Sequence, residues 1–188
     1  MKIILASESP FRKRAMDLLG VAYQTCPSAI DEKAIRHEDA AVLTRTLAEA
    51  KARKVAEKYP DAVIVSGDAV AALRGRIFEK PRDLDEAAAF LRALSDNEFQ
   101  FVTALAVLHA GTQKMLSAVE VSNILFRPLL EREIQNYIRA YPVKNFAGAF
   151  EDDAVLKFAD RVSGSPNIGT AMPVSRLTLM LREQGVEI

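Results

Sequence analysis

The sequence predicts an α/β protein in which helices flank a mixed, twisted sheet. Three observations carry this prediction. Short apolar runs typical of buried strands alternate with segments whose apolar residues recur at helical spacing. The run 62–71 has the length and β-branched content of a central strand. Two long strand-like runs enclose Ala110-Gly111-Thr112-Gln113, a hairpin signal that adds antiparallel pairing to the sheet.

Capping and turn residues divide the chain into its elements. Ser9 suits the N-cap of a first helix, Pro10 its first helical position, and Gly20 the position just past its end. The predicted strands are residues 3–6, 21–26, 62–71, 77–78, 99–109, 115–126 and 155–162. The predicted helices are residues 10–19, 37–59, 84–94, 129–141 and 174–184, several of which end or begin at a proline.

Composition limits the functions that the chain can have. The 188 residues, 49% apolar and 27% charged, are enough for one ample core or for two small lobes that share one. The net charge is zero, so no global field attracts nucleic acid or an anionic membrane. The single cysteine, Cys26, excludes an internal disulfide, and no apolar run reaches transmembrane length. We therefore expect a cytoplasmic protein that partners neither nucleic acid nor membrane.

The start of the first predicted helix has the features of an anion site. Ser7 and Ser9 offer hydroxyl donors beside the unpaired N–H groups of the helix N-terminus. Arg12, Lys13 and Arg14 add positive charge there, although cations oppose the helix dipole by roughly 0.3–1 kcal/mol each. Their presence favours a phosphate-binding site. The alternative is a basic surface helix that follows a strand.

Asp68 is the charged residue whose predicted surroundings are least favourable for a charge. It interrupts the apolar run 62–71, where a carboxylate is expensive unless it has a partner, a metal or a chemical role. Gly67 before it indicates a bulge or a close approach of backbone. The alternative is a carboxylate at a strand end that binds a turn.

Lys80 is a further candidate because it precedes Pro81. A residue before proline favours an extended backbone, which would project the Lys80 ammonium from a fixed position.

Short motifs spread over nearly the whole chain point to one family. They are Leu5-Ala6-Ser7-Glu8-Ser9-Pro10-Phe11-Arg12, Ile30-Asp31-Glu32, Leu47-Ala48-Glu49-Ala50-Lys51-Ala52, Gly67-Asp68, Lys80-Pro81, Ala147-Gly148-Ala149-Phe150 and Pro173-Val174. In this order they resemble the Maf family of nucleoside triphosphate pyrophosphatases. One motif alone would be weak, and the whole series is specific.

The resemblance implies an enzyme that hydrolyses a nucleoside triphosphate to the monophosphate and pyrophosphate with Mg²⁺ or Mn²⁺. It implies a house-cleaning role toward modified nucleotides and a link to septum formation. The fold would be one elongated domain over residues 1–188, with two lobes and a central cleft, similar to inosine triphosphate pyrophosphatase. A homodimer is expected from the resemblance alone.

The resemblance also assigns roles to charged residues. Lys51 and Lys80 match the two phosphate-site lysines of the family, and Arg12 would hold phosphate oxygens. Glu32 and Asp68 match its acidic pair and would bind the metal, a hard cation suited to carboxylates. Asp68 would also be the general base and Glu32 chiefly a metal ligand. The alternatives are an exposed loop acid at Glu32 and a solvated helix lysine at Lys51.

Residues expected near the base resemble the family branch that acts on 7-methyl-GTP. Phe11 offers an aromatic face to the positively charged 7-methylguanine, worth about 0.5–2 kcal/mol. A carboxylate can accept hydrogen bonds from guanine N1–H and the 2-amino group together. Asp153 is the first candidate for this acceptor and Glu151 the second. The alternatives are a core or lid aromatic at Phe11 and a solvated turn for the acids.

Two other functions stay open at this level. A pyrophosphatase of the same family that prefers dTTP and UTP would keep the catalytic residues but not the base-binding ones. The second is a regulatory nucleotide-binding protein of low turnover, which Glu79 favours because the family usually has glycine at this position. Ala69 is a further departure from the family pattern, since it replaces the usual Thr or Gln.

Overall fold

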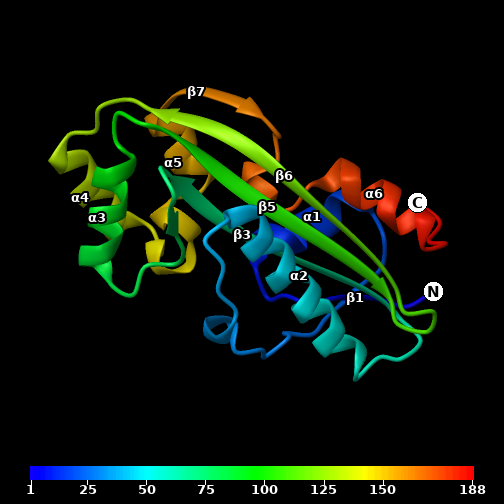
Figure 1. Ribbon diagram of the computed structural model, residues 1–188. Coiled ribbons are helices and arrows are strands. Elements are labelled where there is room, and N and C mark those ends of the chain that lie inside the picture. The colour runs from blue at the N-terminus through cyan, green and yellow to red at the C-terminus, as the bar shows by residue number, and fades with distance from the viewer. The chain divides into compact units, whose positions relative to one another are not determined.

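The computed structural model describes residues 1–188 (Figure 1). The strands are β1 (Ile3–Leu5), β2 (Gln24–Thr25), β3 (Val63–Leu73), β4 (Arg76–Phe78), β5 (Glu98–His109), β6 (Lys114–Phe126) and β7 (Ala159–Gly164). The α-helices are α1 (Pro10–Leu19), α2 (Ala40–Ala56), α3 (Leu84–Leu94), α4 (Glu131–Ala140), α5 (Asp152–Phe158) and α6 (Val174–Glu183). Short 3-10 turns are η1 (Glu32–Ala34), η2 (Val143–Asn145), η3 (Ala147–Ala149) and η4 (Ile168–Thr170). No helix has both the length and the hydropathy that crossing a bilayer requires.

The strands form one mixed sheet in the order β2-β1-β3-β5-β6-β7, with β4 paired to β3 outside that path. β1 is parallel to both of its neighbours, β2 and β3. β4 is antiparallel to β3, and β7 is antiparallel to β6. The predicted α/β class with a mixed sheet is therefore confirmed.

The chain divides into two compact units, which are described separately. The first unit comprises residues 1–69, 103–120 and 170–188, and the second comprises residues 70–102 and 121–169. β1, β2, α1, α2 and α6 lie wholly within the first unit. β4, β7, α3, α4 and α5 lie wholly within the second.

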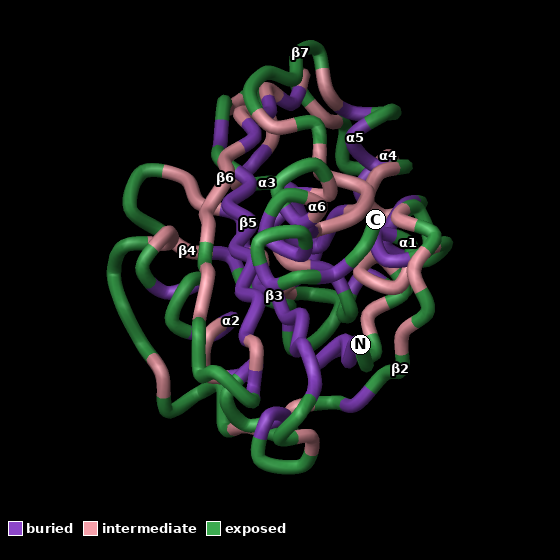
Figure 2. The backbone as a smooth tube through the Cα atoms, turned by 90° about the vertical axis from the view of Figure 1, so that its right-hand side faces the viewer, coloured by how far each residue is buried: buried purple, intermediate pink, exposed green.

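Helices cover both faces of the sheet in the first unit. Because side chains alternate along a strand, Ile3 and Leu5 of β1 face α1 and α6, whereas Ile4 and Ala6 face α2. Residues 3–6 are all buried. Figure 2 shows how the buried residues follow β3 and β5, whose apolar runs fit a sheet covered on both faces.

The second unit has an aromatic core. Edge-to-face contacts join the rings of the five members Phe99, Phe101, Phe126, Phe150 and Phe158. Phe150 is 3% exposed and ends the motif 147–150. Gly148 in that motif has φ +69°, and a Cβ there would lie 2.7 Å from the Phe150 ring, so only glycine fits.

The first helix begins and ends as predicted, and the hairpin and the helix over residues 84–94 are also confirmed. Ser9 is the N-cap of α1, Pro10 follows, and Gly20 ends the helix with φ +67°. The helix predicted over residues 37–59 is shorter, since α2 starts at Ala40. The Asp39 carboxylate accepts hydrogen bonds from two N–H groups of its first turn and so sets its start.

Two predicted strands are corrected. The prediction of a strand over residues 155–162 is wrong in its first half, because residues 152–158 form α5 and only β7 is extended. Asp152 and Asp153 in the first turn of α5 favour a helix there, since they complement its dipole. The strand predicted over residues 21–26 is reduced to the two residues of β2.

Candidate active site

A buried ion pair between α2 and β3 forms the centre of the candidate site. The Lys51 Nζ lies 2.6 Å from the Asp68 Oδ1 and 2.9 Å from the Glu32 Oε1. Lys51 and Asp68 are only 5% and 7% exposed, whereas the Glu32 side chain is 55% exposed. Lys51 is therefore not a solvated helix lysine. Asp68 has the partner that a carboxylate inside an apolar strand requires.

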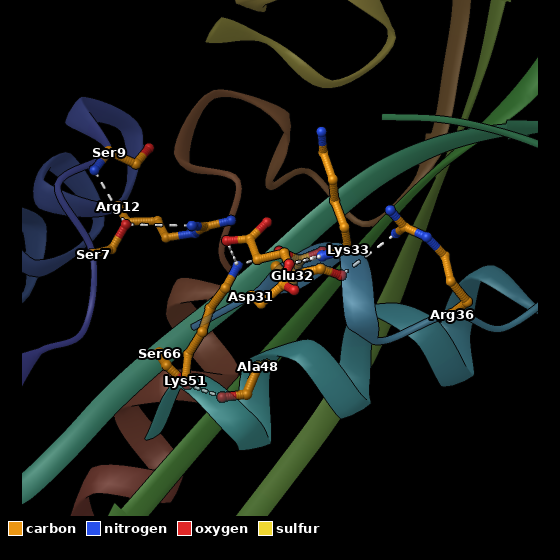
Figure 3. A network of polar contacts seen from close by, with 11 residues as sticks. Ser7, Ser9, Arg12, Asp31, Glu32, Lys33, Arg36, Ala48, Lys51 and Ser66 are labelled. Carbon is orange, nitrogen blue, oxygen red and sulfur yellow. Dashed lines mark hydrogen bonds and ion pairs between the residues drawn. The ribbon is translucent and has the colours of Figure 1, made fainter. Parts of the chain in front are cut away.

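Local structure brings the three groups together. Lys51 lies on the face of α2 that packs on the sheet, and Asp68 lies on β3 opposite it. Glu32 begins η1, a turn capped by the Asp31 carboxylate, which accepts a hydrogen bond from the Lys33 N–H at 3.1 Å. The Arg36 guanidinium donates to the Glu32 carbonyl oxygen from the other end of this loop (Figure 3).

Ser7 organises the start of α1. Its hydroxyl oxygen accepts a hydrogen bond from the Ser9 N–H at 3.1 Å and another from the Arg12 Nη1 at 3.3 Å. Ser9 occupies the N-cap position, but its own hydroxyl caps no helix N–H group. The hydroxyl that fixes this helix start, and with it the Arg12 side chain, therefore belongs to Ser7, which is 8% exposed.

Arg12 points from α1 toward the same group of charges (Figure 3). Burial lowers the pKa of Arg12, and the Asp68 and Glu32 carboxylates oppose this by favouring the charged guanidinium. The Arg12 Nε is buried and has no hydrogen-bond partner. A buried donor without an acceptor is costly, so the Nε is a donor that a ligand with an acceptor atom would satisfy.

Gly67 lets backbone and Arg12 approach β3 closely. A Cβ on Gly67 would lie 2.8 Å from the Ala104 carbonyl oxygen and 3.4 Å from the Arg12 Nε. A side chain at this position would force the neighbouring strand or the guanidinium to move. The close approach predicted from the sequence is confirmed.

Phe11 lies in the first unit, whereas Lys80, Glu151 and Asp153 lie in the second. Phe11 is a half-buried residue of the first turn of α1, next to Arg12. Lys80 is exposed in the segment between β4 and α3. The carbonyl oxygen of Glu79 in that segment accepts a hydrogen bond from the Gly148 N–H at 3.1 Å, which ties it to η3.

The two candidate acids of the base site differ in their surroundings. The Asp153 Oδ2 accepts a hydrogen bond from the Tyr141 hydroxyl at 2.8 Å, and the Lys157 ammonium donates to that hydroxyl in turn. Glu151 is the N-cap of α5. Burial raises the pKa of Glu151, and the neighbouring carboxylates of Asp153 and Asp152 raise it further.

Ser66 is a residue of this region that the sequence interpretation missed. It is fully buried on β3, and its hydroxyl donates to the Ala48 carbonyl oxygen of α2 at 2.5 Å. The signal was present, because a serine two residues before Asp68 points to the same face of a strand. Ser66 was given no role because only the charged residue of this strand was considered. Tyr141, which binds Asp153, was also missed.

The arrangement fits the chemistry of phosphate anions. Two buried or half-buried cations and two carboxylates lie together, with one donor lacking an acceptor. No group of three or more His, Cys, Asp or Glu side chains is placed to hold a metal ion. Mg²⁺ commonly takes one or two carboxylates and completes its shell with water and substrate phosphates, so Glu32 and Asp68 fit such an ion.

Comparison with known proteins places this chain. The family model described as "Maf-like protein" matches residues 2–184. The chain belongs to the Maf family. The predicted resemblance is thereby confirmed, and it covers nearly the full length.

Relatives of this Maf-like protein carry two kinds of name. It is 33% identical to a "7-methyl-GTP pyrophosphatase" of Hydrogenovibrio crunogenus, over 100% of this chain and 94% of that protein. A "7-methyl-GTP pyrophosphatase" of Nitrosococcus oceani is 32% identical over 99% of this chain and 94% of its own length. A "dTTP/UTP pyrophosphatase" of Salinibacter ruber is 33% identical over 96% of this chain and 89% of its own length.

A solved structure shares the fold of this Maf-like protein. The structure of a HAM1 protein from Coxiella burnetii aligns with a TM-score of 0.52, covering 97% of this chain and 99% of that one. The two sequences are 13% identical, so the likeness concerns the fold alone. It agrees with the mixed α/β architecture seen here.

Proposed function

We propose that this protein is a nucleoside triphosphate pyrophosphatase and that its substrate is 7-methyl-GTP, which it cleaves to 7-methyl-GMP and pyrophosphate. Membership of the Maf family and relatives named as nucleotide pyrophosphatases support the reaction class. The single observation that carries the proposal is the cluster of Arg12, Lys51, Asp68 and Glu32, in which Lys51 and Asp68 are buried.

The cluster suits cleavage of a phosphoanhydride. This reaction needs positioning and charge neutralisation more than covalent help from the protein. The Arg12 Nε and the N-terminus of α1 provide donors for phosphate oxygens, and the Lys51 ammonium adds a second positive charge. Lys80 is the further phosphate-site lysine that we propose.

In the proposed step, a water molecule attacks the α-phosphorus, and Asp68 accepts its proton. The bond between the α-phosphorus and the bridging oxygen breaks, and pyrophosphate leaves with the electron pair. Lys51 holds the Asp68 carboxylate through its contact of 2.6 Å and so fixes the direction of proton acceptance. Arg12 would hold the phosphate at which charge develops.

We further propose that Glu32 and Asp68 bind Mg²⁺ or Mn²⁺. When bound, such an ion neutralises phosphate charge and polarises phosphorus–oxygen bonds. Glu32 suits this role because its side chain is 55% exposed and can move toward a ligand. Each carboxylate has a second oxygen besides the one that contacts Lys51.

The preference for 7-methyl-GTP rests on Phe11 and Asp153. Phe11 is the aromatic residue beside Arg12 on α1, and a cationic base favours an aromatic face. Asp153 would accept from the guanine edge, with its carboxylate oriented by Tyr141. The raised pKa of Glu151 makes that residue the second choice for a negatively charged acceptor. The name of the Salinibacter ruber relative supports the alternative, a dTTP/UTP pyrophosphatase.

The Phe11→Ala variant tests the base assignment. We expect its kcat/KM for 7-methyl-GTP to fall about 2- to 30-fold more than its kcat/KM for GTP, because only the methylated base is cationic. Pyrophosphate release is measured for both nucleotides, and for dTTP and UTP, with the wild type and the variant. Phe11→Tyr, which keeps the aromatic face, serves as the control and retains the preference.

Equal losses for 7-methyl-GTP and GTP would remove the cation–π argument. A wild type that prefers dTTP or UTP would keep the reaction class and overturn the proposed substrate. Release of pyrophosphate from none of these nucleotides would overturn the proposed function, and nucleotide binding without release would favour the regulatory binder.

A further inference from the structure

Ser66 is a polar residue in a buried layer that otherwise consists largely of apolar side chains. Its exposure is 0%, and the face of β3 on which it lies packs in a layer of alanine, valine and isoleucine side chains. Its hydroxyl donates to the Ala48 carbonyl oxygen at 2.5 Å. That carbonyl lies inside α2, where the N–H four residues later already satisfies it, so the serine is not needed to rescue an unpaired acceptor.

The hydrogen bond and the buried ion pair are successive contacts along one helix–strand contact line. Ala48 and Lys51 are three residues apart and share a face of α2. Ser66 and Asp68 are two residues apart and share a face of β3. The contacts are separated by about 4.5 Å along the helix and about 6.6 Å along the strand. Figure 3 shows Ser66 and Ala48 beside the Lys51 side chain.

The side chains that pack around this line are mostly small. Ala48, Ala52 and Ala56 come from α2 and Ala6, Ala104 and Ala106 from the sheet side, and the larger members of the cluster are Val55, Ile4, Ile64 and Leu108. Hydrophobic burial is non-directional, and alanine methyl groups interdigitate less deeply than larger side chains. A directional hydrogen bond to one carbonyl oxygen therefore fixes the position of α2 along β3.

We propose that Ser66 is a positioning residue of the active site. By holding Ala48 of α2 on β3, its hydroxyl sets where the Lys51 ammonium meets the Asp68 carboxylate. This inference rests on the proposed function, because the positioned groups are those assigned to proton acceptance and phosphate binding. Ser66 itself lies beneath the site and touches no reacting atom. Displacing catalytic groups by about 1 Å can lower a rate by up to two orders of magnitude.

Kinetics of Ser66→Ala test the inference. With 7-methyl-GTP, or the best nucleotide of the wild type, we expect kcat to fall about ten-fold while KM changes less than two-fold. The contact between Lys51 and Asp68 shifts, whereas the Arg12 donors proposed for phosphate stay in place on α1. The matched control is Thr44→Val. Thr44 is also 0% exposed on α2, but its hydroxyl donates at 2.8 Å to Ala40 of the same helix and not to the strand. The control should keep kcat within two-fold.

Circular dichroism and thermal melting of both variants establish that they fold. If Ser66→Ala is too unstable to assay, Ser66→Cys replaces it, because a thiol is only a weak donor and kcat should again fall. A fall in kcat of less than five-fold, an equal fall in Thr44→Val, or a change confined to KM would overturn the positioning role. A wild type without pyrophosphate release would instead overturn the proposed function, so the two failures are distinguishable.

Discussion

Replacing Asp68 with asparagine is expected to lower kcat for pyrophosphate release by about 10²–10⁴-fold, because the amide cannot accept the proton of the attacking water. The fold should persist. Lys51 keeps its contact with Glu32 at 2.9 Å, and the amide oxygen of the introduced asparagine can still accept a hydrogen bond from the ammonium. The measurement is steady-state pyrophosphate release, with circular dichroism as a check on folding.

Glu57→Gln is the control for this variant. Glu57 is an exposed acid just past the end of α2 that pairs with Lys54 at 2.7 Å, so its loss should leave kcat unchanged. If folded Asp68→Asn kept kcat within ten-fold of the wild type, Asp68 would not be the base.

The largest loss of stability is expected for Lys51→Met. Removing one partner of a buried ion pair typically costs about 3–5 kcal/mol, because the other charge remains buried. Asp68, at 7% exposure, is much less solvated than Glu32, whose side chain is 55% exposed, so it bears most of this penalty. Urea denaturation of wild type and variant gives the difference in free energy of unfolding.

Two comparisons separate this effect from a general loss of lysine. Lys54→Met removes the neighbouring surface pair with Glu57 and should cost no more than about 1 kcal/mol. The double variant Lys51→Met/Asp68→Asn should recover part of the stability, because the residue at position 68 is then no longer a buried carboxylate without its lysine. Equal losses of unfolding free energy in Lys51→Met and Lys54→Met would show that the buried pair contributes no more to stability than the surface pair.

Residues with a local signal were predictable from the sequence. Asp68 stood out because a carboxylate interrupts an apolar run, and Gly67 because a glycine within a strand marks a close approach. The ends of α1 followed from Ser9, Pro10 and Gly20, whose conformational preferences act without tertiary context.

Residues that depend on tertiary packing were not predictable in this way. Lys51 and Lys54 lie one turn apart on α2, and only the position of β3 makes the first a buried partner of Asp68. The family resemblance, and not the residue pattern, singled out Lys51. Ser66 was missed for the same reason, since its role depends on which carbonyl oxygen lies opposite it.

The error over α5 has a different cause. Val155 and Phe158 suit a strand as well as a helix, and short apolar runs do not distinguish the two by periodicity. Asp152 and Asp153 at the start of the segment favour the helix. The sequence interpretation considered Asp153 and Glu151 for the base site, or the acids as a solvated turn, and did not consider their effect on a helix.

The most direct test of the central claim is where the oxygen of water enters the products. Wild-type protein hydrolyses 7-methyl-GTP in ¹⁸O-labelled water, and ³¹P NMR or mass spectrometry locates the label. Attack at the α-phosphorus, as proposed for water activated by Asp68, places the label in the monophosphate and leaves pyrophosphate unlabelled. Label in pyrophosphate, or release of orthophosphate as the first product, would contradict the account.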